Sequence, residues 1–348
     1  MWAVTVQDSG PSNGATPPVL GWAQVPDPTP GPGEVLIAVT ASAVNRADVL
    51  QAAGNYAPPP GASQILGLEC SGRIAAVGDG VDGWSVGDQC CALLAGGGYA
   101  ELVAVPVQQL LPVPDGVDLV SAAALPEAAC TVWSNLVMAA GLSAGQTLLV
   151  HGGGSGIGTM AIQVGKALGA GVAVTAGRAE TLTACAELGA DLLINHRTDD
   201  FVERIADAGG ADVILDVMGA KYLSRNISAL AVGGRLVVVG MQGGTTGELN
   251  IQALMRKQGS VISTALRFRP LTGTGSKQAV VQQVRDRLWP PVAAGTVRPV
   301  IDTVLPMTQA GQAHRRLVAG GHFGKMVLQV PTHDGIDDNQ RTSEGTDR

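Results

Sequence analysis

The chain has 348 residues, a length that favours two domains. With 46% of them hydrophobic and 15% charged, the composition excludes disorder for most of the chain. Its formal net charge is −7 and no basic cluster is longer than a pair, which disfavours a nucleic-acid-binding protein. Neither a signal peptide nor a membrane span is predicted, and five cysteines without C-x-x-C spacing are typical of reduced thiols in a cytoplasmic protein.

The first third of the chain favours short strands separated by Pro/Gly turns. Strands are predicted over 35–39, 72–78 and 98–105, the first of them directly after the turn at 30–33. Little helical pattern lies between them. This spacing is typical of a compact β-rich domain.

From about residue 121 the pattern changes to alternating helices and strands. The strand centres are fully apolar, which indicates burial on both faces, as in a parallel doubly wound sheet. The alternation fades after residue 266, and the polar tail 331–348 is predicted to be disordered. The expected elements are a helix over 121–140 ended by Gly141, strands over 147–150, 172–175, 212–216 and 235–240, helices over 156–169 and 179–188, and a last strand over 324–330.

A glycine-rich turn follows the strand at 147–150 and precedes a helix, the context that gives such a turn its meaning. In the G-x-G-x-x-G register, Gly153 is expected to permit the turn and Gly158 to permit close helix–strand packing. Ser155 takes the second place, where its hydroxyl can donate to a phosphate oxygen beside the backbone N–H groups. A loop without a ligand is the alternative. The predicted pyrophosphate contacts are Gly153, Gly154, Ser155, Gly156, Ile157 and Gly158.

The end of the next strand bears on the choice of coenzyme. NAD-specific sites place an acidic residue there to bond the ribose 2′-hydroxyl. This chain has Gly177 followed by Arg178, and a planar guanidinium suits a 2′-phosphate. A solvated surface arginine is the alternative, and Glu180 lies close by. The pattern favours NADPH over NADH.

Four segments then carry a resemblance over nearly the whole chain: 45–48 (NRAD), 54–61 (GNYAPPPG), 66–69 (LGLE) and 125–128 (LPEA). The glycine turn and the segment 324–328 reinforce it. Together they resemble the zinc-independent, zeta-crystallin-like quinone oxidoreductases of the medium-chain dehydrogenase/reductase superfamily.

The resemblance implies an α/β fold in which a Rossmann doubly wound parallel sheet is inserted in a GroES-like β-rich catalytic domain. Residues 1–124 and 267–330 would form the catalytic domain, and residues 125–266 the NADPH-binding domain. It also implies a cytoplasmic homodimer that pairs Rossmann sheet edges, here the strand at 260–264.

Zinc-containing members carry a Cys where Asn45 stands and a His where Leu68 stands, so the resemblance implies that no metal is bound. Alcohol oxidation needs a Lewis acid or a base to remove the hydroxyl proton. Quinone reduction does not, because the acceptor is already electrophilic, and holding the two reactants together is most of the work. The expected activity is therefore NADPH-dependent reduction of quinones by hydride transfer.

The same resemblance places Asn45 and Tyr56 beside the nicotinamide and the acceptor as catalytic residues, with a turn-forming Asn and a packed Tyr as the alternatives. Asp48 is expected to be an orienting carboxylate, and Cys130 a packed thiol rather than a reactive one. Further coenzyme contacts are implied for Thr131, His196, Gly240, Met241, Leu266 and Arg267.

Two other functions stay open. One is the reduction of enones or enoyl thioesters, which uses the same hydride delivery but needs a proton donor, for which Tyr56 is the candidate. The other is a non-catalytic NADPH-binding or RNA-associating crystallin-like protein, which the lack of a basic groove disfavours.

Overall fold

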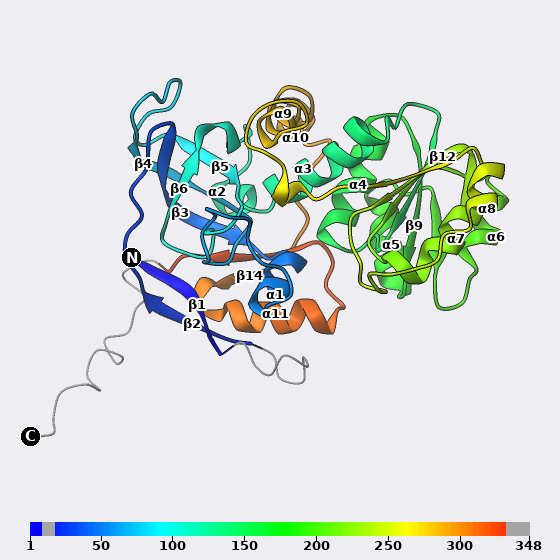
Figure 1. The fold of residues 1–348 in the computed structure, drawn as a ribbon, viewed down its shortest axis with the longest axis horizontal. Helices are drawn as coiled ribbons and strands as arrows, with labels where there is room; N and C mark the ends of the chain where they lie inside the picture. Colours follow the sequence, from blue (N-terminus) through cyan, green and yellow to red (C-terminus); the bar gives the residue numbers. More distant parts are fainter. Residues whose placement is uncertain (9–17, 332–348) are drawn as a thin grey trace, which may run out of the picture.

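The computed structural model describes residues 1–8 and 18–331, and most of the tail predicted to be disordered lies outside the described residues. Two sheet regions stand side by side, a β-rich one and an α/β one, with helices between them (Figure 1). The expected fold class is confirmed, with the β-rich sheet built from both ends of the chain and the parallel sheet from its middle.

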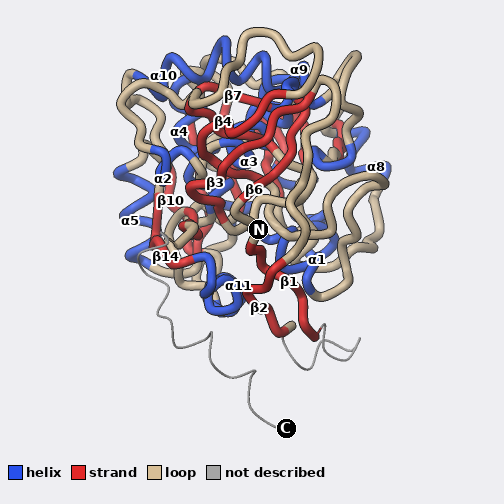
Figure 2. The backbone as a smooth tube through the Cα atoms, turned by 90° about the vertical axis from the view of Figure 1, so that its left-hand side faces the viewer, coloured by secondary structure: helices blue, strands red, loops and turns tan. Residues whose placement is uncertain are grey.

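The β-rich sheet has the order β14-β15-β3-β4-β5-β7, with β6 pairing with β3. Strands β14 and β15 come from the C-terminal part of the chain, so this sheet is completed by residues that follow the parallel sheet in sequence. A hairpin of β1 and β2 lies beside it (Figure 2). The bounds are β1 Trp2–Asp8, β2 Val19–Gln24, β3 Glu34–Ala43, β4 Glu69–Val77, β5 Gln89–Leu93, β6 Leu102–Pro106, β7 Leu110–Pro112, β14 Ile301–Pro306 and β15 Lys325–Gln329.

The strand predicted over 98–105 starts later, at Leu102. Ala100 makes only an isolated bridge to Ala3. The backbone of the residues before Leu102 is bonded elsewhere: the Tyr99 N–H donates to the Leu66 carbonyl, and the Glu101 N–H donates to the Trp2 carbonyl.

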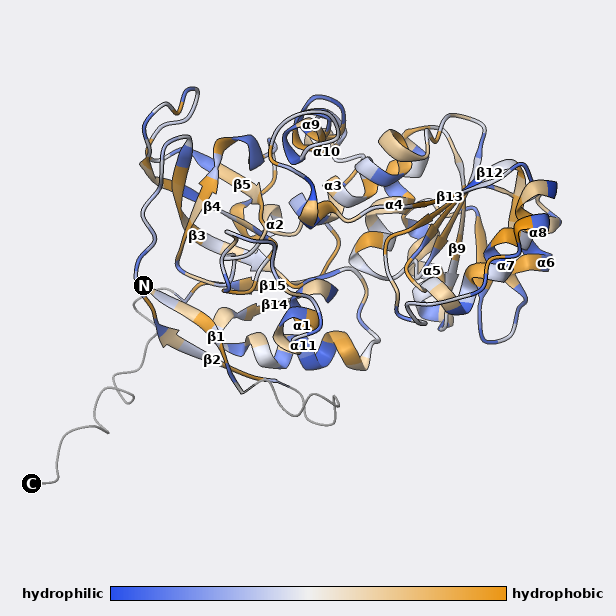
Figure 3. Ribbon diagram, in the orientation of Figure 1, coloured by the Kyte–Doolittle hydropathy of each residue, from blue (hydrophilic) through white to orange (hydrophobic). Residues whose placement is uncertain are grey.

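The second sheet is parallel, with the order β10-β9-β8-β11-β12-β13, the arrangement of a dinucleotide-binding Rossmann domain. Its central strands are apolar and buried on both faces, and appear as an orange layer in Figure 3. The bounds are β8 Thr147–His151, β9 Gly171–Ala176, β10 Leu192–Asn195, β11 Ala211–Asp216, β12 Leu230–Val238 and β13 Ser260–Ser263.

The helices of this domain begin and end near the predicted residues. Gly169 and Gly189, with φ values of 78° and 103°, follow α4 and α5 as expected of C-terminal caps. The bounds are α4 Gly156–Ala167, α5 Ala179–Glu187, α6 Phe201–Ala206, α7 Leu223–Ala229 and α8 Ile251–Arg256.

The single helix predicted over 121–140 is wrong. The segment forms α2 (Leu119–Ala122), α3 (Pro126–Val132) and a π-helical stretch over Trp133–Ala139. Pro126 starts a new helix because it lacks the N–H that an uninterrupted helix would need there. The stretch widens because the carbonyl of Thr131 accepts hydrogen bonds from the side chains of Ser134 and Asn135.

After residue 266 the chain forms α9 (Lys277–Gln283), a second π-helical stretch (Val284–Leu288), α10 (Trp289–Ala293) and α11 (Ala310–Ala319). Helices α9 and α10 pack with α3 and α4 in one hydrophobic core, which also receives Leu93 and Leu111 from the β-rich sheet. Because this core contains residues of both sheet regions, the burial of its apolar surface holds the two regions together.

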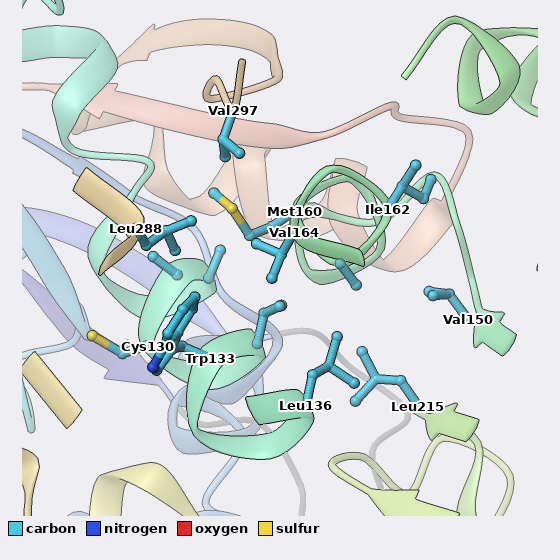
Figure 4. Close-up of a cluster of buried hydrophobic side chains, with 14 of the residues drawn as sticks. Cys130, Trp133, Leu136, Val150, Met160, Ile162, Val164, Leu215, Leu288 and Val297 are labelled. Atoms are coloured by element: carbon cyan, nitrogen blue, oxygen red, sulfur yellow. The ribbon is translucent and has the colours of Figure 1, made fainter. Parts of the chain in front are cut away.

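Figure 4 shows the centre of that core, where Trp133, Met160 and Leu288 pack together. Cys130 lies in it, fully buried, and burial raises the pKa of its thiol well above the usual value. The expectation of a packed thiol is confirmed. The other four cysteines are also buried and free. Among the described residues, no helix is both long and apolar enough to cross a membrane.

Candidate active site

The glycine turn connects β8 to α4 as predicted, but the roles within it differ. The left-handed residue is Gly152, with φ 73°, and not Gly153. Gly153 is needed for another reason: a Cβ there would lie 3.0 Å from Cβ of Val174 and from Sγ of Cys185. Ser155 caps α4, because its Oγ accepts from the Gly158 N–H at 3.0 Å and donates to the Gly152 carbonyl at 2.8 Å.

The remaining glycines of the turn permit close packing around the start of α4. A Cβ on Gly158 would lie 2.3 Å from the Gly152 carbonyl oxygen, so only glycine permits this packing, as predicted. Gly154 and Gly156 likewise bring the backbone close to its neighbours, and their N–H groups lie at the start of a 12-residue helix. Backbone donors at such a helix start suit the pyrophosphate of a dinucleotide. The hydroxyl of Ser155 is already used within the turn.

Basic side chains converge on Gly177 at the end of β9. A Cβ there would lie 2.9 Å from Nε2 of His196 and 3.0 Å from Nε of Arg197. Arg178 follows directly, and its Nη2 donates to the Gly321 carbonyl at 2.5 Å. Arg197 was missed from the sequence, although it directly follows His196, because nothing local shows that β10 ends beside β9.

Asn45 lies at the start of α1 (Arg46–Ala52), in a charged hydrogen-bond network. Its Nδ2 donates to Oε1 of Glu69 at 2.8 Å, and its Oδ1 accepts from Nζ of Lys325 at 2.6 Å. Lys325 also pairs with Glu69 at 2.6 Å, and both of these side chains are almost fully buried. Sequence reasoning missed both partners, since Lys325 is 280 residues from Asn45.

Lys325 also links this network to the glycine turn. Its side chain passes Gly156 so closely that a Cβ there would lie 2.3 Å from Cδ of the lysine. The Gly324 N–H donates to the Gly154 carbonyl at 2.9 Å. The structure therefore brings Asn45 of the β-rich domain to the start of α4, as expected of residues in one site.

Asp48 has the orienting role expected of it. Its carboxylate accepts from the N–H groups of Asn45 and Gly67 and from the hydroxyl of Tyr99, at 2.8, 3.1 and 3.2 Å. Burial is the main reason why its pKa rises to about 6, against which these hydrogen bonds act. The carboxylate thereby fixes the loop that carries Asn45.

Glu127 is a site residue that the sequence did not reveal. Its N–H donates to Oε2 of Glu69 at 2.9 Å, and Thr131 Oγ1 lies 3.4 Å from its carboxyl group. Burial, followed by the charge of Glu69, raises the pKa of Glu127 to about 8, so the carboxyl is protonated at neutral pH. Glutamate is common in the first turn of a helix, so its presence there does not identify a functional residue.

Tyr56 is half-buried, with Phe268 edge-on to its ring at 5.5 Å and the Arg267 guanidinium 5.3 Å from the ring centre. Its hydroxyl makes no hydrogen bond to any described residue. Burial and then the charge of Glu127 raise the pKa of Tyr56, so the phenol keeps its proton. The side chain can therefore donate to a bound molecule.

The other predicted coenzyme contacts lie in α3, in the loop after β12 and at the domain junction. Thr131 adjoins Glu127, and Gly240 lies in the loop after β12, with Met241 57% exposed beside it. Leu266 and Arg267 are buried at the domain junction. The Arg267 side chain turns toward the β-rich domain, donating to the Ala95 carbonyl, so only its backbone is free to face a coenzyme.

No metal-ligating cluster accompanies these residues. In the described parts of the chain no three His, Cys, Asp or Glu side chains are placed to hold a metal ion together. Leu68 is 1% exposed and apolar beside Glu69.

Comparisons with known proteins decide the family. The alcohol dehydrogenase GroES-like domain model matches residues 31–115, and the zinc-binding dehydrogenase model matches residues 156–279. The quinone oxidoreductase of Rattus norvegicus is 32% identical over 306 residues, which cover 86% of this chain and 90% of that protein. The chain belongs to the quinone oxidoreductase family of medium-chain dehydrogenases/reductases. The resemblance inferred from the sequence is confirmed, and the chain is an oxidoreductase of this superfamily.

Solved structures agree with this assignment. An NAD-dependent alcohol dehydrogenase is 31% identical, with a TM-score of 0.82 over 95% of this chain and 100% of that one. A mycobacterial protein solved with NADPH is 27% identical, with a TM-score of 0.83 over 94% and 99%. The enoyl reductase CurK is 26% identical, with a TM-score of 0.80 over 95% and 99%.

Proposed function

We propose that this protein reduces quinones by hydride transfer from NADPH, without a catalytic metal. The observation that carries the proposal is the meeting of two sets of groups. The glycine turn, suited to a pyrophosphate, contacts Lys325, and Lys325 holds Asn45 and Glu69. Glu127 connects this network to the free phenol of Tyr56, since its N–H donates to Glu69 and its charge acts on the phenol. The relatives named as quinone oxidoreductases support the substrate class.

NADPH, when bound, supplies the hydride. The chain supplies position and charge: Lys325 and Glu69 fix the Asn45 amide, and the backbone N–H groups of the turn hold a pyrophosphate. Tyr56 donates its hydroxyl proton in a hydrogen bond to the acceptor oxygen that gains negative charge. Glu127, neutral at neutral pH, holds a proton for the product near enough for its charge to act on Tyr56.

The cluster at Gly177 supports NADPH rather than NADH. His196 and Arg197 lie against Gly177, a position where NAD-specific sites need an acid, and Arg178 follows it directly in the chain. The NADPH complex of the mycobacterial relative supports the same choice, whereas the alcohol dehydrogenase relative is NAD-dependent.

Reduction of enones or enoyl thioesters is the second candidate, supported by the similarity to an enoyl reductase. That reaction needs a proton at the α-carbon in addition to the hydride. Tyr56 and Glu127 are the available donors.

The test is NADPH oxidation with ortho- and para-quinones, enones and an enoyl thioester side by side. We expect turnover with quinones and little with the others. Tyr56→Phe is expected to lower kcat about 10- to 100-fold, as for loss of a donor to a developing oxyanion. Tyr222→Phe is the matched control, because Tyr222 packs on Phe201 inside the Rossmann domain. Turnover of enones alone would assign the second function instead.

A further inference from the structure

A groove of about 310 Å³ lies beside Arg267 and Lys277. Its walls are the loop 59–63, which follows Tyr56, the turn 94–96, and the segment 267–271 at the domain junction. Arg267 connects this groove to Tyr56, because its guanidinium lies 5.3 Å from the centre of the Tyr56 ring. A molecule held by Tyr56 can therefore extend into this groove.

The groove is basic. Arg267, Arg269 and Lys277 line it, and among the described residues the one acidic side chain in its lining is Glu34. Glu34 is engaged elsewhere, since its Oε2 accepts from the Gly31 N–H at 2.9 Å. Positive charge is thus left in excess within a partly enclosed space.

Lys277 is the unusual member of this set. It is 6% exposed, yet its ammonium makes no hydrogen bond or ion pair with any described residue. It is also the first residue of α9, where the helix dipole disfavours a cation. Burial lowers its pKa, which shows the cost of keeping it charged there. Neither helix stability nor a protein partner accounts for a lysine at this place.

The two arginines differ in whether all their buried donors have acceptors. Arg267 is satisfied, with its guanidinium donating to the Ala95 carbonyl and to Oε1 of Gln51. Arg269 donates from Nη1 to the Gly275 carbonyl at 2.6 Å, but its buried Nε has no partner among the described residues. The buried Nε of Arg269 and the ammonium of Lys277, which line one groove, therefore lack acceptors among the described residues.

We propose that this groove binds an anionic substituent of the acceptor, a carboxylate or a phosphate monoester, through Lys277 and Arg269. This inference rests on the proposed function and narrows it to conjugated carbonyl compounds that carry an acidic arm. The arm takes no part in the chemistry. It pairs with the lysine and the arginine, which holds the conjugated ring against Tyr56.

The test uses a 1,4-naphthoquinone with a propionate side chain, its methyl ester, and the same ring with a phosphate-bearing chain. The readout is the ratio of kcat/KM for each acid to kcat/KM for the ester. We expect a ratio of about ten in the wild-type protein, and a ratio near one in Lys277→Gln. Arg269→Gln should lower it, Lys277→Arg should retain it, and high salt should reduce it. The larger of the two acid ratios identifies the anion.

Lys166→Gln is the matched control, because Lys166 pairs with Asp191 on the surface and should leave the ratio unchanged. A wild-type ratio of one, or a ratio that persists in Lys277→Gln, would overturn the inference. Calorimetric binding of naphthoate and its methyl ester to the NADP⁺-loaded protein separates the two proposals. Tighter naphthoate binding that is lost in Lys277→Gln, without quinone turnover, would retain the groove and reject the quinone. If Lys277→Gln does not fold, Arg269→Gln and Lys277→Arg decide in the same assays.

Discussion

The basic side chains around Gly177 give the most specific prediction at the residue scale. Arg178→Ala and Arg197→Ala should each weaken NADPH binding about tenfold, because each removes a charge-assisted contact to the 2′-phosphate. NADH binding should change little, since it lacks that phosphate. Fluorescence titration of both coenzymes measures this. Arg204→Ala, in a surface pair with Asp199, is the control. If a variant lost affinity equally for both coenzymes, its arginine would not be a ligand of the 2′-phosphate.

The raised pKa of Glu127 leads to a prediction of how the free energy of unfolding depends on pH. Its pKa is raised from 4.5 to about 8 in the folded protein, so the folded state binds the extra proton. Its contribution to the free energy of unfolding is therefore complete below about pH 4.5 and is lost as pH rises through about 8. Asp48, whose pKa is raised to about 6, likewise contributes to the free energy of unfolding at low pH and loses this contribution as the pH rises through about 6.

Glu127→Gln keeps the shape of the side chain and cannot ionise. We expect its Tm to exceed that of the wild type by a few degrees at about pH 9, and the difference to vanish at about pH 5. Differential scanning fluorimetry across this range measures it. A constant difference at all pH values would mean that the Glu127 carboxyl is not protonated in the folded protein.

At this scale the sequence predicted residues carried by local motifs, such as Asn45, Asp48 and the glycines of the turn. It could not predict Lys325 or Glu127, because their importance arises only where β15 and α3 meet Glu69. Tertiary contact, and not residue type, makes them part of the site.

At the scale of the elements, two glycines of the glycine turn are expected to respond differently to substitution by alanine. Gly158→Ala would place its Cβ 2.3 and 2.7 Å from the backbone oxygens of Gly152 and Gly153, which cannot move aside. We expect a lower Tm and loss of NADPH binding. Gly156→Ala meets the flexible side chain of Lys325 instead. That variant should fold but lose activity, because Lys325 is displaced from Asn45 and Glu69.

Thermal melting, NADPH titration and quinone turnover of the two variants together test this difference. If both variants lost Tm equally, or if Gly156→Ala kept full activity, the account of the turn would be wrong.

Helix ends marked by glycine were predicted well, but the helix over 121–140 was not. Pro126 allows either a kink or a new start, and the side chains of Ser134 and Asn135 can face solvent or the helix backbone. Composition alone does not choose between these conformations. Packing in the shared core does.

For the whole molecule, β13 forms the edge of the parallel sheet, as the predicted homodimer requires. Val261 on this edge is 38% exposed. We expect the wild type to sediment as a dimer and Val261→Asp to sediment as a monomer, because like charges would face each other across a two-fold axis. Val232→Asp, at an exposed site of β12, is the control. A wild-type monomer would refute the edge pairing.

The division into two sheets was predictable because short strands with Pro/Gly turns give way to alternating helices and strands near residue 121. The resemblance indicated which parts of the chain form each domain. The domain boundaries at 124/125 and 266/267 remain a prediction. The core shared by α3, α4, α9 and α10 crosses both regions, so sheet membership alone does not place those boundaries.

The central claim is hydride transfer from NADPH to a quinone at a site without metal. It is tested most directly by mixing chelator-dialysed protein, loaded with NADPH, with a quinone in a single turnover. We predict oxidation of one NADPH per active site, slowed when the transferred hydrogen at C4 is deuterium, and unaffected by the chelator. No oxidation, or oxidation that is lost on chelation and restored by zinc, would contradict the account.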